Sequence, residues 1–140
     1  MLGGSIWEIW SILQGTNPQH MGVQYDIRHA TVEGGLNWSN GLRLVQSSIK
    51  TVVLKDFYWA KQNGKWITKN VPLGEGMVDF KAYFKLLKQY KIEVPFCLHL
   101  EYPELGGANN GAFNITVEPE VVYNAMKRDL DTARRLWLEA

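Results

Sequence analysis

The hydrophobic pattern divides the chain into short apolar runs and longer stretches with an apolar residue at every third or fourth position. Short runs are typical of buried strands, and the longer spacing is typical of helices that bury one face. The runs predict strands at residues 22–27, 51–54 and 94–100. The spacing predicts helices that begin near Ser5, Leu42, Asp79 and Pro119, so helices and strands alternate along the chain.

Turn signals separate these elements. A polar stretch with Gly34-Gly35 and Asn40-Gly41 predicts an irregular connection after the first strand. Asn63-Gly64 lies between two tryptophan-containing runs and predicts a two-residue hairpin turn, inserted after the second strand as a lid or packing element. Gly and Asn residues at 106–111 predict a loop before the last helix.

Strands that alternate with helices form parallel sheets with right-handed crossovers. A closed eight-stranded barrel takes about 250 residues, so the 140 residues of this chain have room for less than half of one. Two architectures remain, a small open sheet and a part of a barrel. Ionisable residues follow each predicted strand, and this favours the barrel, because barrels of this kind carry their sites at the carboxyl ends of strands. The predicted fold class is α/β, a partial (β/α)8 TIM barrel.

Composition excludes several classes of partner. The chain has 15 basic and 14 acidic side chains and a net charge of +1. No basic run suits nucleic acid or an anionic membrane, so we expect neither as a partner. No apolar stretch reaches the length of a membrane span, and the first residues lack the pattern of a signal peptide. The single Cys97 is expected to pack in the core, and the expected location is cytoplasmic.

The candidate chemistry lies just after the predicted strands. Asp26 and His29 follow the first strand, Lys55 follows the second, and Glu101 follows the third. Each has a plainer reading: Asp26 as a turn cap, His29 as a loop residue bonded to backbone, and Lys55 in a salt bridge at the rim. An acid directly after an apolar strand is costly to bury without a partner, so Glu101 is the strongest functional candidate.

Their neighbours are open to the same two readings. Side chains alternate along a strand, so only one of Lys55 and Asp56 points inward, and Lys55 shares the face of Val53. His99 shares the face of Glu101, but reads slightly better as a core histidine with its hydrogen bonds satisfied. Arg28 reads better as a solvated residue.

Four motifs resemble a known family. Their order and spacing are similar to those in the C-terminal part of sugar phosphate isomerase/epimerase proteins of the xylose-isomerase-like barrel superfamily. The motifs are residues 22–35, Lys55-Asp-Phe57, residues 72–80 and His99-Leu-Glu-Tyr102. The resemblance covers nearly the whole chain and implies that residues 1–140 hold strands six to eight of the barrel, with the helix before them.

The resemblance also implies roles for single residues. Asp26 becomes the metal ligand of strand six, His29 a group that binds metal or a substrate oxygen, and Glu101 the ligand of strand eight. The implied cofactor is a divalent metal ion, Mn²⁺, Mg²⁺ or Zn²⁺. Glu101, His29 and Lys55 are the expected catalytic residues. The family's strand-seven histidine falls at Val53, and its strand-five glutamate lies before Met1, so we expect an incomplete site.

Three functions follow as hypotheses. The first is a metal-dependent isomerase or epimerase of a small sugar, keto-sugar or sugar phosphate, which moves a proton next to a carbonyl. The second is a non-catalytic or truncated family member. The third, hydrolysis at abasic DNA, ranks lowest, because that chemistry needs more histidines than the three present. An open three-stranded sheet also predicts self-association or pairing with a missing N-terminal half.

Overall fold

The computed structural model describes residues 4–140. Helices and strands alternate as predicted, with one helical segment more than expected and a hairpin between the second strand and the next helix. The α-helices are α1 (Ile6–Leu13), α2 (Ile27–Gly34), α3 (Trp38–Val45), α4 (Phe80–Gln89) and α5 (Pro119–Glu139). The strands are β1 (Val23–Asp26), β2 (Ile49–Leu54), β3 (Asp56–Gln62), β4 (Lys65–Val71) and β5 (Phe96–Leu98).

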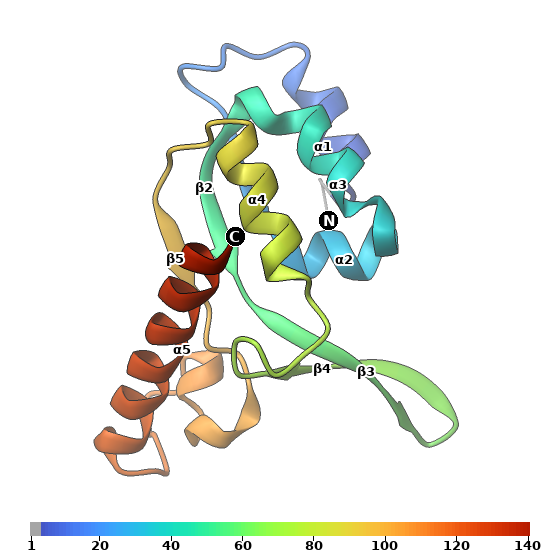
Figure 1. Ribbon diagram of the computed structural model, residues 1–140. Helices are drawn as coiled ribbons and strands as arrows, with labels where there is room; N and C mark the ends of the chain where they lie inside the picture. The colour runs from blue at the N-terminus through green and yellow to red at the C-terminus, as the bar shows by residue number, and fades with distance from the viewer. Residues whose placement is uncertain (1–3) are drawn as a thin grey trace.

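Three strands form a parallel sheet in the order β1-β2-β5. Asp26 of β1 is in register with Val53 of β2, and Val53 is in register with Cys97 of β5. The carboxyl ends of the three strands therefore lie side by side at one edge of the sheet. The predicted parallel sheet is confirmed, and α2, α3 and α4 lie in the connections between its strands (Figure 1).

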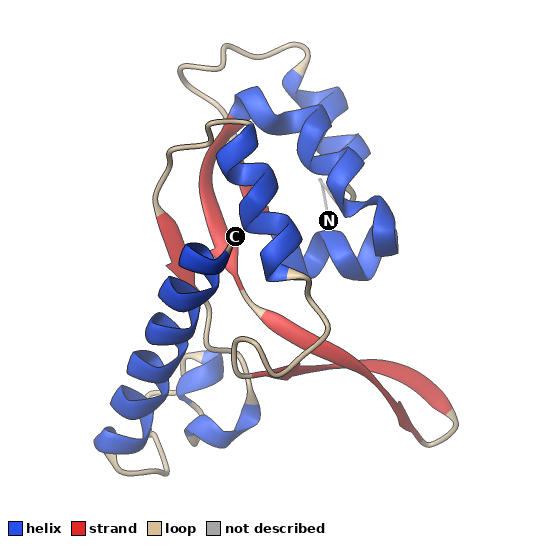
Figure 2. Ribbon diagram, viewed as in Figure 1, coloured by secondary structure: helices blue, strands red, loops and turns tan. Residues whose placement is uncertain are grey.

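One face of the sheet carries the hydrophobic core. Tyr25, Val52 and Leu54 point to this face and are buried against Leu42 of α3 and Phe84 of α4. Figure 2 shows the helices that cover the strands on this side. Full burial of one such side chain stabilises the fold by roughly 1.5–3 kcal/mol. The apolar residues whose pattern predicts the strands thus also hold the helices on the sheet.

The opposite face is different. Because Phe96 and Leu98 turn toward the core side, Cys97 between them must face the other way, and there it is exposed. The expectation that Cys97 packs in the core is therefore wrong. Thr51 lies next to it, with its oxygen 3.8 Å from the Cys97 sulfur.

The first connection is helical where a turn was predicted. Asp26 caps α2 through its Oδ1, which accepts a hydrogen bond of 3.1 Å from the backbone N–H of His29. The two glycines that suggested a turn lie at the end of this helix, where Gly35 has a φ of 53°. They end the helix instead of preventing it. A 3-10 helix (Gly35–Asn37) then leads into α3, which begins four residues before Leu42.

The predicted hairpin is confirmed and is longer than a small insertion. β3 and β4 pair over seven residues each, around a turn in which Asn63 and Gly64 both have positive φ. Such turns suit the twist of antiparallel strands. The hairpin extends away from the helices, toward the lower right of Figure 1.

The last helix, α5, is fixed at its middle and near its end. At its middle, the hydroxyl of Tyr102 donates to the buried Asp129 at 3.1 Å, and burial raises the pKa of Tyr102 to about 12. Near its end, the ring of Trp137 lies edge-on to the rings of Phe84 and Phe96, each 5.4 Å away between centroids.

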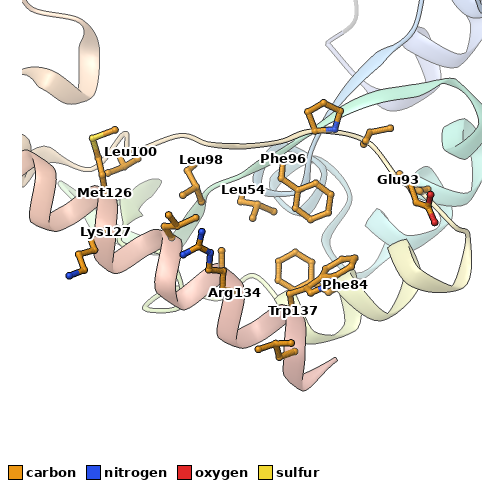
Figure 3. A pocket seen from close by; sticks show the side chains of 16 residues that line it. Leu54, Phe84, Glu93, Phe96, Leu98, Leu100, Met126, Lys127, Arg134 and Trp137 are labelled. Atoms are coloured by element: carbon orange, nitrogen blue, oxygen red, sulfur yellow. The ribbon is translucent and has the colours of Figure 1, made fainter.

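Between β5 and α5 an apolar groove of about 1200 Å³ stays open. Figure 3 shows the side chains that line it, among them Leu98 of β5, Leu100 just beyond that strand and Met126 of α5.

Candidate functional site

The candidate residues come together at the carboxyl ends of the strands. Asp26 is the last residue of β1, Lys55 follows β2 directly, and Glu101 lies three residues beyond β5. The Lys55 Nζ is 3.2 Å from Asp26 Oδ2 and 2.9 Å from Glu101 Oε2. The two carboxylates therefore converge at one edge of the sheet, and an ammonium group lies between them.

Lys55 is the buried centre of this cluster. Its side chain is only 5% exposed, and its Nζ also lies 3.4 Å from His29 Nε2. Lysine is almost never fully buried without partners, and here it has two carboxylates and an imidazole. The salt bridge therefore forms, but inside the site and not on a solvated rim.

Asp26 has both of the roles that its sequence position allowed. Oδ1 caps α2, while Oδ2 forms an ion pair with the Lys55 ammonium. Since the two oxygens act separately, the cap fixes the direction of the carboxylate toward the site. The first turn of the helix and the ion pair are built by one side chain.

His29 lies at the outer edge of the cluster. Its side chain is 54% exposed, with Nε2 3.6 Å from Asp26 Oδ2. Burial lowers its pKa, and the positive charges of Lys55 and Arg28 act in the same direction, against the raising effect of Asp26 and Glu101. The imidazole is therefore neutral at pH 7, and a hydrogen bond from Lys55 requires Nε2 to be its unprotonated nitrogen.

Glu101 is the more accessible of the two carboxylates, with 39% of its side chain exposed. Partial burial acts to raise its pKa, but the hydrogen bond and charge of Lys55, aided by His99, outweigh burial and lower it. His99 Nδ1 lies 3.4 Å from Glu101 Oε1 and its side chain is partly exposed, so it is not a core histidine. Glu101 is ionised throughout the neutral range.

A cavity of about 410 Å³ opens beside these groups. This volume is within the range of small-molecule sites. Ile6 and Ile9 of α1 give it an apolar side, opposite the polar cluster. Glu33 also lines it, and burial raises the pKa of this carboxyl, with the charges of Asp26 and Glu8 acting in the same direction.

Sequence reasoning missed Glu33, although the signal was present. Asp26, His29 and Glu33 follow one another at intervals of three and four residues, which is the spacing of one helical face. The glycines at 34 and 35 predict a turn here and obscure this helical spacing.

The hairpin also takes part in building the site. Arg28 donates from Nε to Asn70 Oδ1 at 3.2 Å and from NH2 to Thr68 Oγ1 at 2.7 Å, and it lies over the ring of Phe57. The reading of Arg28 as a solvated residue is therefore wrong. Asn70 in turn donates to the backbone carbonyl of Glu101 at 3.3 Å. Sequence reasoning did not find Thr68 or Asn70, because only the fold brings β4 to these residues.

Asp56, the neighbour of Lys55, has a structural role. It is 1% exposed, and its carboxylate accepts hydrogen bonds from four backbone N–H groups. The donors are those of Phe57, Gly74, Gly76 and Val78, at 2.8–3.1 Å. Strand alternation predicted that only one of the pair points inward, and that residue is Lys55.

The fit of a divalent metal ion can be tested on these side chains. Two carboxylates and an imidazole converge, but the space between the carboxylates is filled by the Lys55 ammonium. Val53, where the resemblance would place the strand-seven histidine, is a buried apolar side chain. In residues 4–140 no group of three or more His, Cys, Asp and Glu side chains is arranged to hold a metal. The residues as placed do not fit the ion, and the ligand roles of Asp26, Glu101 and His29 stay a prediction.

No helix within the described part of the chain is long and apolar enough to cross a membrane.

Comparison with known proteins identifies the fold. Among curated proteins none matches the chain. Among solved structures, a xylose isomerase domain protein from Planctomyces limnophilus is similar, with a TM-score of 0.60 and 20% sequence identity. The similarity covers 94% of this chain and 42% of that one, so this chain spans less than half the length of its structural relative. The family described as xylose isomerase-like TIM barrel matches residues 1–134, which confirms the predicted partial barrel. This chain belongs to the xylose isomerase-like TIM barrel family.

Proposed function

We propose that the chain forms one side of the substrate site of a sugar or keto-sugar isomerase or epimerase. The observation that carries this proposal is the cluster of Asp26, Lys55, Glu101 and His29 beside a cavity of about 410 Å³. A base, a cation and a neutral imidazole are the groups needed to move a proton next to a carbonyl. Family membership supports the same class of reaction.

In the proposed reaction Glu101 is the general base. It takes a proton from the carbon next to the substrate carbonyl, and the electron pair moves to the carbonyl oxygen to give an enediolate. Lys55 stabilises the negative oxygen, and His29 passes a proton between the two oxygens. Return of this proton from Glu101 to the former carbonyl carbon gives the isomer. Protonation of the original carbon on its opposite face, by an acid other than Glu101, gives the epimer.

The ion pair links substrate binding to this step. Lys55 holds the pKa of Glu101 low, which makes the carboxylate a weak base before substrate binds. A substrate oxygen that takes over the Lys55 hydrogen bond weakens this effect and strengthens the base. A divalent metal ion, Mn²⁺, Mg²⁺ or Zn²⁺, enters none of these steps, because Lys55 fills the space between the carboxylates.

We further propose that the site is completed by other βα units of a barrel, which supply the remaining contacts to substrate. The 42% coverage of the solved relative supports this arrangement. Complete isomerisation then belongs to the whole barrel, and this chain contributes the base, the cation and the imidazole, which are the groups that proton exchange next to the carbonyl requires.

Proton exchange with solvent tests the function. The protein is incubated in D₂O with a panel of ketoses and ketose phosphates, and NMR follows deuterium uptake next to the carbonyl. We expect exchange with at least one compound and a loss of about 10²-fold or more in Glu101→Gln. The matched control is Glu104→Gln, an exposed glutamate of a 3-10 helix (Pro103–Leu105), which should leave exchange unchanged. Exchange that persists in Glu101→Gln would contradict the proposed base.

A non-catalytic sugar-binding module is the second candidate. Val53 favours it, because an apolar side chain stands where the family supplies a ligand. The exchange experiment distinguishes the two candidates. A sugar-binding module binds a ketose, which changes chemical shifts in the NMR spectrum, but does not exchange the protons of the ketose with solvent.

A further inference from the structure

We propose that Lys55 is the resident cation of this site and takes the place of a divalent metal ion, so that removal of its ammonium group creates a metal site. The inference concerns ion binding alone and goes beyond the reaction proposed above. It follows from the distances around Nζ, from the residues that β2 supplies, and from the charge of the cluster.

The distances around Nζ are those of an ammonium group. Asp26 Oδ2 and Glu101 Oε2 lie 3.2 and 2.9 Å from it, and His29 Nε2 lies at 3.4 Å. Contacts from a hydrogen-bonding nitrogen to oxygen are about 2.7–3.2 Å long, whereas Mg²⁺ and Ca²⁺ hold oxygen ligands at about 2.0–2.6 Å. The carboxylates are therefore spaced for hydrogen bonding to an ammonium group.

Strand β2 supplies the cation where it would otherwise supply a ligand. Val53 is level with Asp26 in the sheet and cannot coordinate anything. Lys55, two residues further, lies on the same face by strand alternation and brings its charge to the position between the carboxylates. It is also held there by burial, since only 5% of its side chain is exposed.

The charge of the cluster determines how removal of the Lys55 ammonium changes ion binding. With Lys55 present, two carboxylates face one ammonium and a neutral imidazole, so a divalent ion would sit next to a like charge in a buried place. Without the ammonium, the carboxylates of Asp26 and Glu101 carry two negative charges with no cation between them. Their oxygens and the His29 nitrogen then surround the position that Nζ occupied. Carboxylate oxygens with an imidazole are suitable ligands for Mn²⁺.

Mn²⁺ titration by calorimetry, without any sugar, tests this inference. The proteins compared are the wild type, Lys55→Ala, and Lys55→Ala combined with Glu101→Gln. We expect Lys55→Ala to bind Mn²⁺ at least about tenfold more tightly than the wild type, and the added Glu101→Gln to remove that gain. The matched control is Lys50→Ala, an exposed lysine of the same strand, which should bind Mn²⁺ as the wild type does.

The wild type alone can overturn the inference if the Lys55 variants do not fold. Wild-type binding of Mn²⁺ with a Kd near or below about 10 μM that Glu101→Gln abolishes would show that the ion displaces Lys55. Wild-type binding equal to or tighter than that of a folded Lys55→Ala variant would overturn it as well. Circular dichroism checks that each variant is folded. Since no sugar is present, these outcomes are independent of the exchange experiment.

Discussion

At the scale of single residues, Lys55 connects parts of the chain that are far apart in sequence. Its ammonium contacts Asp26 and His29 at the start of α2 and Glu101 beyond β5. A buried charge with partners on two sides stabilises the fold only while all of them are present, because removal of one leaves the others unpaired. Stability and chemistry therefore depend on the same group.

Lys55→Met tests the stabilising part of this role. The substitution keeps an apolar stem of similar length and leaves the mostly buried Asp26 without its cation. We expect the free energy of unfolding to fall by about 2–3 kcal/mol, less than for a fully buried pair because Glu101 is partly hydrated. Urea denaturation followed by tryptophan fluorescence measures the loss.

The control combines Lys55→Met with Asp26→Asn, which removes the unpaired charge but keeps a good helix cap. The double variant should be no less stable than Lys55→Met alone. A loss below about 0.5 kcal/mol in Lys55→Met would contradict the argument, because that is the usual scatter of surface substitutions.

The pH dependence of stability isolates Glu101. Its pKa is lowered in the folded state, so the unfolded chain binds more protons between that pKa and the ordinary glutamate value. The contribution of Glu101 is therefore complete above the ordinary value and is lost as the pH falls through the lowered one. We expect the stability difference between wild type and Glu101→Gln to shrink on acidification over this window, measured by urea denaturation. A difference that is constant with pH would disprove the ionic contact.

At the scale of elements, Asp56 fixes the connection between β4 and α4. Its carboxylate binds backbone N–H groups on both sides of Gly76, where an added Cβ would collide with Asp56 Oδ1 and the Phe57 carbonyl. The glycine is needed for close approach of two backbone segments, since its φ is not positive. The connection is therefore anchored to Asp56 at the start of β3, the sequence neighbour of Lys55.

Gly76→Ala should consequently destabilise the protein by about 1–3 kcal/mol, as overpacking does. Gly15→Ala is the matched control, because a Cβ there meets nothing within 4 Å and the residue is exposed. Thermal unfolding measured by circular dichroism compares the two. Equal melting temperatures for both variants would show that the carboxylate does not hold this connection.

The elements also show how far the sequence could predict the structure. Strands β1 and β2 and helices α1 and α4 were predictable, because their hydrophobic periods match the face that each buries. Helix α2 was not, since its few apolar positions are outweighed by Gly34 and Gly35, and only the cap position of Asp26 and the polar spacing of His29 and Glu33 indicate it. β5 is shorter than its apolar run because β2, its one partner in the sheet, ends at Leu54. The contacts of Lys55 and Asn70 depend on strand register and hairpin placement, which no local pattern contains.

At the scale of the whole molecule, the groove between β5 and α5 leaves apolar side chains without a covering layer. In the solved relative, more than half of the chain lies outside the region matched here. In a solution that holds only these 140 residues, the one occupant available for the groove is a second copy. We therefore expect the isolated chain to self-associate at micromolar concentration, as measured by sedimentation velocity.

A pair of substitutions on α5 locates the contact. Met126 lines the groove and is 49% exposed, whereas Tyr123 on the same helix is 67% exposed and lies outside the groove. Met126→Glu should weaken association and Tyr123→Glu should not. A monodisperse wild-type monomer that unfolds cooperatively would contradict the prediction.

The thiol of Cys97 is a chemical probe of the uncovered face of the sheet. It is the one cysteine of the sequence, and it is exposed on the face opposite the core. The rate at which an alkylating reagent reacts with this thiol measures how accessible that face is to solvent. Any polypeptide that closes the barrel over Thr51 and Cys97 should slow the reaction, and one that covers only the groove beside α5 should not. A single mass-spectrometric time course thus distinguishes closure of the barrel from docking on its outer side.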